Sequence, residues 1–220
     1  MHKTEKFWDF LSKNYDRGDD NPSDRQDLDL IKKYLDPSDI LFEFACGTGT
    51  LSLLIAGQVK EIHAIDISSK MLAAAQRKAA EHKIEHIHFA HTTLYDERYK
   101  PGSFDVVMAF NILHLLPDLQ PALQRINELL KPGGIFISTT PCLGEQMAIY
   151  NRLLMPLLRL SSKIGIIPQV NFFNASELEG FFANANFQML ETQDFYNGNT
   201  DHFIVARKIE RIEPSPVQRI

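Results

Sequence analysis

Cysteine is scarce in this sequence, and its scarcity narrows the setting in which the protein works. Only Cys46 and Cys142 occur among the 220 residues, and neither belongs to a CxxC motif. Two isolated cysteines of this kind are typical of a protein from a reducing compartment. The N-terminal stretch MHKTEKFWDF also lacks the apolar segment of a secretory signal. We therefore expect a cytoplasmic protein.

Excess positive charge and long apolar runs are missing as well. The formal net charge is -5, with 23 Lys and Arg against 28 Asp and Glu, and acids crowd the stretch from Asp16 to Asp29. Because such a chain repels a polyanion, we expect no nucleic-acid partner. The apolar stretch LLMPLLRL is short and is interrupted by Pro156 and Arg159, so we expect no integral membrane association.

What is present is the composition of an ordinary globular protein. Hydrophobic residues make up 44% of the chain and charged residues 23%, and this length fits one α/β domain with a cap. Neither an internal repeat nor a linker divides the sequence, so we expect a single domain over residues 1–220. A small-molecule substrate is the expected partner, and a homodimer is left open.

The most informative stretch is DILFEFACGTGTLSLLIAGQVKEIHAID, residues 39–66. An apolar run ends in a glycine-rich turn, a helical pattern follows, and a second apolar run ends on Asp66. This order is the first half of a nucleotide-binding βαβ unit. Gly47 and Gly49 allow the backbone to turn sharply and to approach a ligand closely. Asp66 is placed to accept hydrogen bonds from two ribose hydroxyls.

Two classes of cofactor use this layout, and the details of the turn separate them. A dinucleotide fingerprint is G-x-G-x-x-G, but GTGTLS has Ser52 at the third position. The stretch FEFACGTGT, with Glu43 two residues before Ala45, instead resembles the E/D-x-G-x-G-x-G motif of class I S-adenosylmethionine-dependent methyltransferases of the small-molecule type. Ala45 stands where that family usually has its first glycine.

Two further blocks of sequence extend this resemblance. SFDVVMAFNILHLLPD and LKPGGIFIST look like the fourth and fifth motif blocks of the same superfamily, in order and at family-like spacing. The match covers about residues 39–140. Near the C-terminus, FQMLETQDFY and DHFIVARKI read as a hairpin with Asn197-Gly198 at its turn. A final antiparallel hairpin strand is a methyltransferase feature that dinucleotide dehydrogenases lack.

The resemblance implies a Rossmann-like α/β fold, with a doubly wound, mostly parallel sheet of seven strands, an antiparallel C-terminal hairpin strand and a helical cap. The apolar runs predict the first five strands over Ile40–Phe44, Val59–Ile65, Ile84–Ala90, Phe104–Phe110 and residues 135–140. Helices are expected after Asp66 with Ser68 or Ser69 as cap, over Leu119–Leu130 with a stop at Pro132-Gly133-Gly134, and over Asn174–Asn186 with Asn174 or Ser176 as cap.

The same resemblance implies how S-adenosyl-L-methionine is held. It places Glu43, Ala45, Gly47 and Gly49, with Cys46 and Thr48 between them, around the methionine part of the cofactor. Asp66 is implied at the ribose, and Ile67 with Met71 beside the adenine. The acid that often follows the third strand is missing at His91 to Thr93, so Thr93, Asp96 or a backbone group is left to read the adenine amino group. Asn111 ends the fourth strand, at the edge of the sheet where ligands bind.

Two segments outside these motifs are candidates for enclosing a substrate. Within residues 1–36, Phe7, Phe10, Leu11 and Tyr15 form a helical stripe. It is either a helix packed on the domain edge or a lid that brings Trp8 or Tyr15 near the cofactor. Residues 142–171, rich in Leu, Ile and Met, either extend the core or cover the substrate, with Tyr150 in contact with it. Their apolar character suggests an apolar or aromatic methyl acceptor.

The histidines allow chemical roles that the sequence leaves open. His114 lies three residues after Asn111 and either takes a proton from a hydroxyl substrate or packs at a helix start. The segment NILH differs from the N/D-P-P-Y signature of amino-nitrogen methylation. His86 and His88 share one strand face, so a metal pair is conceivable. No cysteine is near, and exposed edge residues are the simpler interpretation, so we expect no metal.

Three functions are therefore compared. The first is methyl transfer from S-adenosyl-L-methionine to a small molecule by in-line displacement, which depends on alignment and on exclusion of water. The second is an NAD(P)-dependent oxidoreductase, against which the missing third glycine and the terminal hairpin count. The third is a methyltransferase-like module that binds without turnover, against which the intact Glu43, Gly47, Gly49 and Asp66 count.

Overall fold

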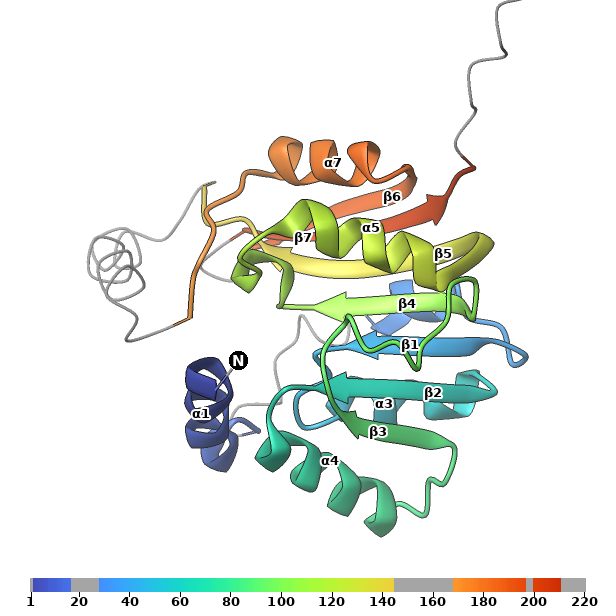
Figure 1. Cartoon of the computed structure of the whole chain (residues 1–220). Helices are drawn as coiled ribbons and strands as arrows, with labels where there is room; N and C mark the ends of the chain where they lie inside the picture. The colour runs from blue at the N-terminus through green and yellow to red at the C-terminus, as the bar shows by residue number, and fades with distance from the viewer. Residues whose placement is uncertain (1, 17–27, 145–167, 197–199, 211–220) are drawn as a thin grey trace, which may run out of the picture.

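The protein is described by a computed structural model that covers residues 2–16, 28–144, 168–196 and 200–210. A seven-stranded sheet with the order β3-β2-β1-β4-β5-β7-β6 runs through it (Figure 1). The strands are β1 Ile40–Phe44, β2 Glu61–Asp66, β3 Ile87–His91, β4 Phe104–Phe110, β5 Leu130–Pro141, β6 Phe187–Tyr196 and β7 Thr200–Lys208. The first five are mutually parallel, and β7 pairs antiparallel with both β5 and β6. This confirms the predicted fold class.

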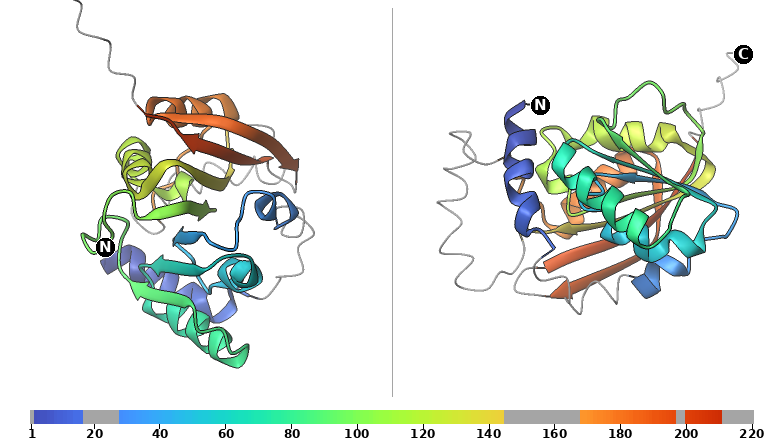
Figure 2. Two further views of the ribbon diagram at one scale, coloured as in Figure 1. Left: turned by 90° about the vertical axis from the view of Figure 1, so that its right-hand side faces the viewer. Right: turned by 90° about the horizontal axis from the view of Figure 1, so that it is seen from below.

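Helices cover both faces of the sheet (Figure 2). They are α1 His2–Leu11 with the 3-10 turn η1 Ser12–Asn14, α3 Thr50–Ile55 with η2 Ala56–Gln58, α4 Ser69–Glu81, η3 Leu113–Leu115, α5 Leu119–Leu129 and α7 Ala175–Asn184. Residues 28–32 are also helical. The apolar sides of α5 and α7 pack on one face, while α3, α4 and the helical stretch 28–32 bury Ile55, Leu72 and Ile31 on the other. Within the described ranges, no helix is both long and apolar enough to cross a membrane.

The strand order reverses next to β1, and this reversal positions the site. β1 pairs in parallel with β2 on one side and with β4 on the other. From β2 the chain continues to β3 at one edge of the sheet, and from β4 it continues to β5, toward the other edge. In open α/β sheets, ligands bind outside the carboxyl ends of the strands at such a switch point. Figure 1 shows α1 beyond these carboxyl ends, on the side of β2 and β3.

The structure corrects several predicted boundaries. The third strand begins at Ile87 rather than Ile84, because Lys83 adopts a left-handed conformation and Ile84 N–H closes the end of α4 on the Ala79 carbonyl. The second strand begins at Glu61 and the fifth already at Leu130. Leu130 already pairs with Phe104 on β4, and Ile135 pairs with Val106. Pro132-Gly133-Gly134 therefore lies within the fifth strand, where the pairing register shifts, as well as after the helix.

The predicted helix caps are resolved by hydrogen bonds. Ser68, rather than Ser69, caps α4 by accepting from Met71 N–H. Asn174, rather than Ser176, caps α7, and its partner Glu177 completes a capping box. Most of the predicted cover, together with Tyr150 and the hairpin turn at Asn197-Gly198, lies outside the described residues.

Candidate functional site

The glycine turn between β1 and α3 has three residues in the left-handed region. Gly47 and Gly49 have φ of 55° and 72°, and Ala45 has φ of 60°. Glycine adopts such angles freely, whereas alanine does so at a cost of about 1–2 kcal/mol. A glycine at position 45 is therefore what the backbone favours, and Ala45 keeps the same shape under mild strain. Hydrogen bonds from Cys46 N–H to the Ile65 carbonyl, 3.0 Å, and from Gly49 N–H to the Cys46 carbonyl, 2.9 Å, hold the turn against β2.

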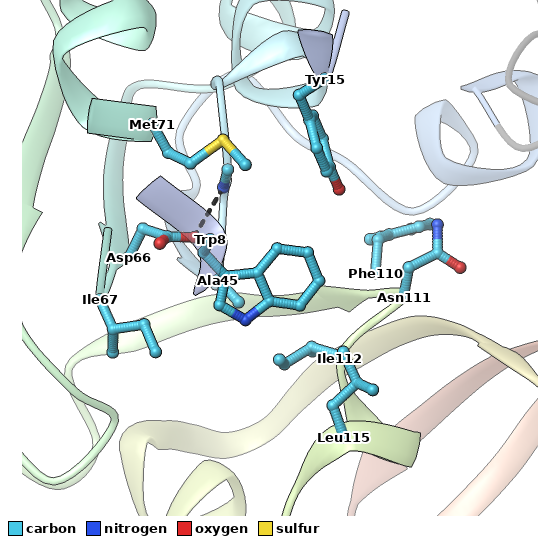
Figure 3. A pocket seen from close by; sticks show the side chains of 11 residues that line it. Trp8, Tyr15, Ala45, Asp66, Ile67, Met71, Phe110, Asn111, Ile112 and Leu115 are labelled. Atoms are coloured by element: carbon cyan, nitrogen blue, oxygen red, sulfur yellow. Dashed lines mark hydrogen bonds between the residues drawn. The ribbon is translucent and has the colours of Figure 1, made fainter. Parts of the chain in front are cut away.

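Asp66 joins this turn to the start of α4. One carboxylate oxygen accepts from Gly47 N–H at 2.9 Å, the bond dashed in Figure 3, and the other accepts from Ser68 N–H at 2.7 Å. Burial raises the pKa of Asp66 above its usual value, and the amides of Ser68, Gly47 and Ile67 oppose that rise. The carboxylate is thus held in one place, with part of its acceptor capacity already used by the protein.

A cavity opens beside Asp66, between the N-terminal segment and the ends of β2 and β4 (Figure 3). Its space, including the part open to solvent, is about 430 Å³. The residues that line it are Trp8, Tyr15, Ala45, Gly47, Asp66, Ile67, Met71, Phe110, Asn111, Ile112 and Leu115. Most of these side chains are apolar, and the carboxylate of Asp66 contributes the charge.

Polar contacts fix the N-terminal segment above the cavity. The Asp9 carboxylate accepts from Ser68 Oγ at 2.6 Å and from Lys70 N–H at 3.2 Å, so α1 is tied to the first turn of α4. Asp16, after η1, accepts from Thr48 Oγ1 at 2.5 Å in the glycine turn. The rings of Trp8 and Tyr15 meet edge to face at 6.5 Å, and both line the cavity.

Eight of the residues singled out in the sequence line this cavity. They are Trp8, Tyr15, Ala45, Gly47, Asp66, Ile67, Met71 and Asn111. Asn111 itself has φ of 54°, a left-handed conformation that asparagine tolerates better than most residues. Sequence reasoning missed Phe110, Ile112 and Leu115 as wall residues. Their position just before and after Asn111, at the carboxyl end of β4, was the available signal.

The other predicted residues lie outside the cavity wall. Gly49 faces Ala75 and Phe89, and Thr48 is held by Asp16 and Lys78. Cys46 is buried, and burial raises the pKa of its thiol well above the usual value. Thr93 is half-buried in the loop after β3. Asp96, the suggested reader of the adenine amino group, is engaged by Thr92 and Arg98 instead.

Glu43 is buried beneath the glycine turn rather than exposed to the cavity. Its side chain accepts a hydrogen bond from Ser52 Oγ on α3, and both residues are almost fully buried. Burial raises the pKa of Glu43 to about 7; the Ser52 hydrogen bond lowers it, and the charge of Asp66 raises it. Ser52 occupies the position of the third glycine in a dinucleotide fingerprint. The serine that stands there in place of glycine makes the hydrogen bond to Glu43.

His114 lies on η3, next to the cavity residue Leu115. Burial lowers the pKa of His114 to about 4, so the ring is neutral at neutral pH. Its Nδ1 is buried and has no hydrogen-bond partner among the described residues. Its backbone carbonyl accepts from Asn171 N–H at 2.7 Å, which brings the end of the predicted cover against η3. The ring itself is not part of the cavity wall.

Three histidines near the third strand have protein partners. His86 Nε2 lies 2.8 Å from the Ala56 carbonyl, and His88 and His63 lie 3.0 and 2.9 Å from Glu61 Oε1. Across the described ranges, no group of three or more His, Cys, Asp or Glu is placed to hold a metal ion.

Comparison with known proteins agrees with this architecture. A family model described as a methyltransferase domain matches residues 35–200. A demethylmenaquinone methyltransferase from Staphylococcus aureus (strain MRSA252) is 26% identical over 209 residues, covering 86% of each chain.

Solved structures share the fold. The YcgJ protein of Bacillus subtilis has a TM-score of 0.68 at 16% identity, over 84% of this chain and 99% of that one. The phosphoethanolamine N-methyltransferase 2 of Haemonchus contortus, in complex with phosphomonomethylethanolamine and S-adenosylhomocysteine, has a TM-score of 0.68 at 16% identity, over 84% of this chain and 53% of that one.

The residues present fit S-adenosylmethionine. Apolar side chains stand beside a buried carboxylate at the end of β2, and a glycine turn leaves backbone, rather than side chains, facing the cavity. The oxidoreductase alternative is therefore set aside. Because the family model covers most of the chain, the protein belongs to the methyltransferase domain family and is an S-adenosylmethionine-dependent methyltransferase acting on small molecules.

Proposed function

We propose that this enzyme methylates an apolar, ring-bearing small molecule, and that the acceptor lies against the side chains at the end of β4. The observation that carries the proposal is the wall of the cavity. Phe110, Ile112 and Leu115 line it from the end of β4 and Trp8 lines it from α1; the charged group, Asp66, lies at the end of β2, and Asn111 is the polar residue among those at the end of β4. Burying an aromatic ring against such a wall is favourable by about 25 cal/mol per Å² of apolar surface, and a charged acceptor would lose hydration without a partner.

The relative with matching length supports an acceptor of this kind. The demethylmenaquinone methyltransferase from Staphylococcus aureus has 86% of its chain in the match. Demethylmenaquinone is an apolar molecule with an aromatic ring system. We therefore propose a quinone-like or phenolic ring as the acceptor class.

In this proposal the described residues hold the reactants and exclude water. The cofactor supplies a methyl group bonded to a positively charged sulfur. Asp66, with Ala45 and Gly47, is proposed to hold it at the ribose and methionine ends, and Ile67 with Met71 beside the adenine. Alignment and water exclusion are the main requirements of an in-line displacement.

The N-terminal segment, α1 with η1, is proposed to act as the lid. Trp8 and Tyr15 line the cavity from this part of the chain, and its contacts through Asp9, in the last turn of α1, and through Asp16, after η1, are polar. Such contacts break and re-form more readily than a buried apolar interface, which suits a segment that admits and releases ligands.

His114 is proposed to support the cavity through η3, because its ring lies outside the cavity wall and a pKa of about 4 makes it a weak base. We therefore expect it to make a modest contribution to the rate. The cytoplasmic location is proposed on the scarcity of cysteine alone.

The acceptor proposal is tested by methyl transfer from labelled S-adenosylmethionine to a panel of acceptors. The panel holds a demethylated naphthoquinol, simple phenols, and charged amines such as phosphoethanolamine. The ring compounds should be methylated and the charged amines should not. Trp8→Ala should raise the KM for the ring acceptor, whereas Phe10→Ala should not, because Phe10 lies on the same helix with 75% of its surface exposed. Methylation confined to charged amines, or equal effects of the two variants, would contradict the proposal.

A further inference from the structure

Glu43 is a carboxyl group placed at the centre of the sheet. In the ladder it stands beside Ala64 of β2 and Met108 of β4, and only 3% of its surface is exposed. The hydrogen bond that reaches its side chain comes from Ser52 Oγ, on the helix that follows the glycine turn. Ser52 has no exposed surface. A carboxyl group in such a place is costly to ionise unless a positive charge is near.

The groups that face Glu43 supply no positive charge. Asp66 acts on it from the end of β2, and the thiol of Cys46 is close enough to feel both acids. Ser52 faces it from α3, and its partner on β4 is the uncharged Met108. Within the part of the chain that the structure describes, no Lys, Arg or His perturbs Glu43; the charge of His91 acts on Asp66 instead. Glu43 and Asp66 are therefore two neighbouring buried carboxyl groups without a cation between them.

The cofactor would bring the missing charge. S-adenosylmethionine carries a sulfonium and an ammonium group against one carboxylate and is a net cation, whereas S-adenosylhomocysteine lacks the sulfonium and is net neutral. We propose that Ser52 is a positioning residue that holds the Glu43 carboxylate beneath the glycine turn, and that binding of the cationic cofactor is coupled to the release of one proton from Glu43 to solvent. Glu43 lies outside the cavity wall, so it acts through its charge, which is weakly screened in a buried place.

The direction in which cofactor affinity changes with pH follows from the linkage between cofactor binding and protonation of Glu43. A nearby cation stabilises the ionised carboxylate, so the pKa of Glu43 falls when the cofactor is bound. In the unliganded protein, burial raises the pKa of Glu43 to about 7. Below that pH, part of the free energy of cofactor binding is used to remove the proton from Glu43. Affinity therefore increases as the pH rises, and it levels off above that pKa. If the bound pKa lies below about 6, the increase between about pH 6 and pH 8 is about tenfold.

Calorimetry on the whole chain tests this coupling. S-adenosylmethionine is titrated at about pH 6, 7 and 8, at each pH in two buffers whose ionisation enthalpies differ, so that the protons released can be counted. The wild-type protein should release close to one proton per ligand at the lowest pH and almost none at the highest. S-adenosylhomocysteine, which is net neutral, should show a smaller release, because it lacks the sulfonium charge. The readout needs no acceptor, so it is independent of the acceptor proposal.

Three variants separate the roles of the two residues. Glu43→Gln should abolish both the proton release and the pH dependence. Ser52→Ala removes the hydrogen bond that stabilises the ionised carboxylate, so the midpoint of the pH dependence should move upward. Ser52→Thr keeps the hydroxyl and should restore the wild-type midpoint. Ser176→Ala, an exposed serine on α7, controls for the loss of a hydroxyl elsewhere.

Titration of the wild-type protein gives a second measurement should a buried variant fold poorly. Carbon-13 spectra of labelled glutamate carboxyl groups should show one group titrating near neutral pH without ligand and at lower pH with S-adenosylmethionine. A wild-type affinity that is flat between about pH 6 and 8 would overturn the proposal. The proposal would also fail if Glu43→Gln kept the proton release, or if Ser52→Ala left the midpoint unchanged.

Discussion

Adding one methyl group at Gly49 should test the geometry of the cofactor turn with a stability measurement. Gly49 has φ of +72°, and a Cβ at this position would lie 2.9 Å from the Ala75 Cβ on α4 and 3.1 Å from the Phe89 ring on β3. Both neighbours are anchored in helix and strand, so they cannot move aside cheaply. Gly49→Ala therefore combines backbone strain with a steric overlap.

The size of the effect follows from these two terms. An L-residue in the left-handed region costs about 1–2 kcal/mol, and an extra methyl in a packed place costs about 1–3 kcal/mol. Alanine also lowers the conformational entropy of the unfolded chain relative to glycine, which stabilises the folded protein by about 0.4–1 kcal/mol. We expect Gly49→Ala to lower the free energy of unfolding by about 3 kcal/mol, a large part of the roughly 5–15 kcal/mol of a typical domain.

Two other glycines allow the terms to be separated by urea unfolding. Gly102 has φ of +66° but open space where a Cβ would stand, and Gly57 has open space and no positive φ. Gly102→Ala should lose about 1 kcal/mol, the strain less the gain from the unfolded chain, and Gly57→Ala should gain about 0.4–1 kcal/mol. Equal losses for Gly49→Ala and Gly102→Ala would refute the overlap, and a neutral Gly49→Ala would refute the turn geometry itself.

Three further changes probe the same site. Ala45→Gly relieves the left-handed strain but loosens the unfolded chain, so the two effects nearly cancel; stability in urea should change by less than about 1 kcal/mol, and a larger loss would mean that Ala45 is unstrained. Asp66→Ala should weaken S-adenosylhomocysteine binding by about 1.5–3 kcal/mol for each ribose bond lost; wild-type affinity by calorimetry would place Asp66 outside the site. Asp9→Ala should release α1 and shift the fluorescence of Trp8, the single tryptophan, toward that of an exposed ring. The hydrogen bond with Ser68 holds the pKa of Asp9 below 3.8, so the wild-type contact should persist at neutral pH and be lost only as the pH falls below that value. Unchanged Trp8 fluorescence in Asp9→Ala would contradict the idea that Asp9 holds α1 in place.

Much of the fold could be predicted because it depends on local patterns. The buried run Phe104–Phe110 became β4 without change of boundary, and the order of strand, turn, helix and strand around Gly47 was confirmed. Boundaries were wrong where a backbone conformation outweighed hydrophobicity, as at Lys83, whose left-handed φ delays the third strand. A pattern of apolar residues carries no information about such angles.

The site was harder to predict because its contacts join distant parts of the chain. The anchor between Asp9 and Ser68 spans 59 positions, and nothing in either local sequence predicts it. Glu43 was correctly placed on the first strand, but which way its carboxylate points depends on the packing of α3. The proposed roles of Thr93 and His114 depended on the resemblance and on sequence spacing, and the structure places both outside the cavity wall.

The central claim, that this chain is an S-adenosylmethionine-dependent methyltransferase, is tested most directly by ligand-dependent thermal unfolding. A ligand that binds only the folded state stabilises it by about 2.7 kcal/mol at a concentration of about 100 times its Kd. S-adenosylhomocysteine should therefore raise the Tm in a concentration-dependent way, and NADH at the same concentrations should leave it unchanged. A rise in Tm with NADH and none with S-adenosylhomocysteine would contradict the claim.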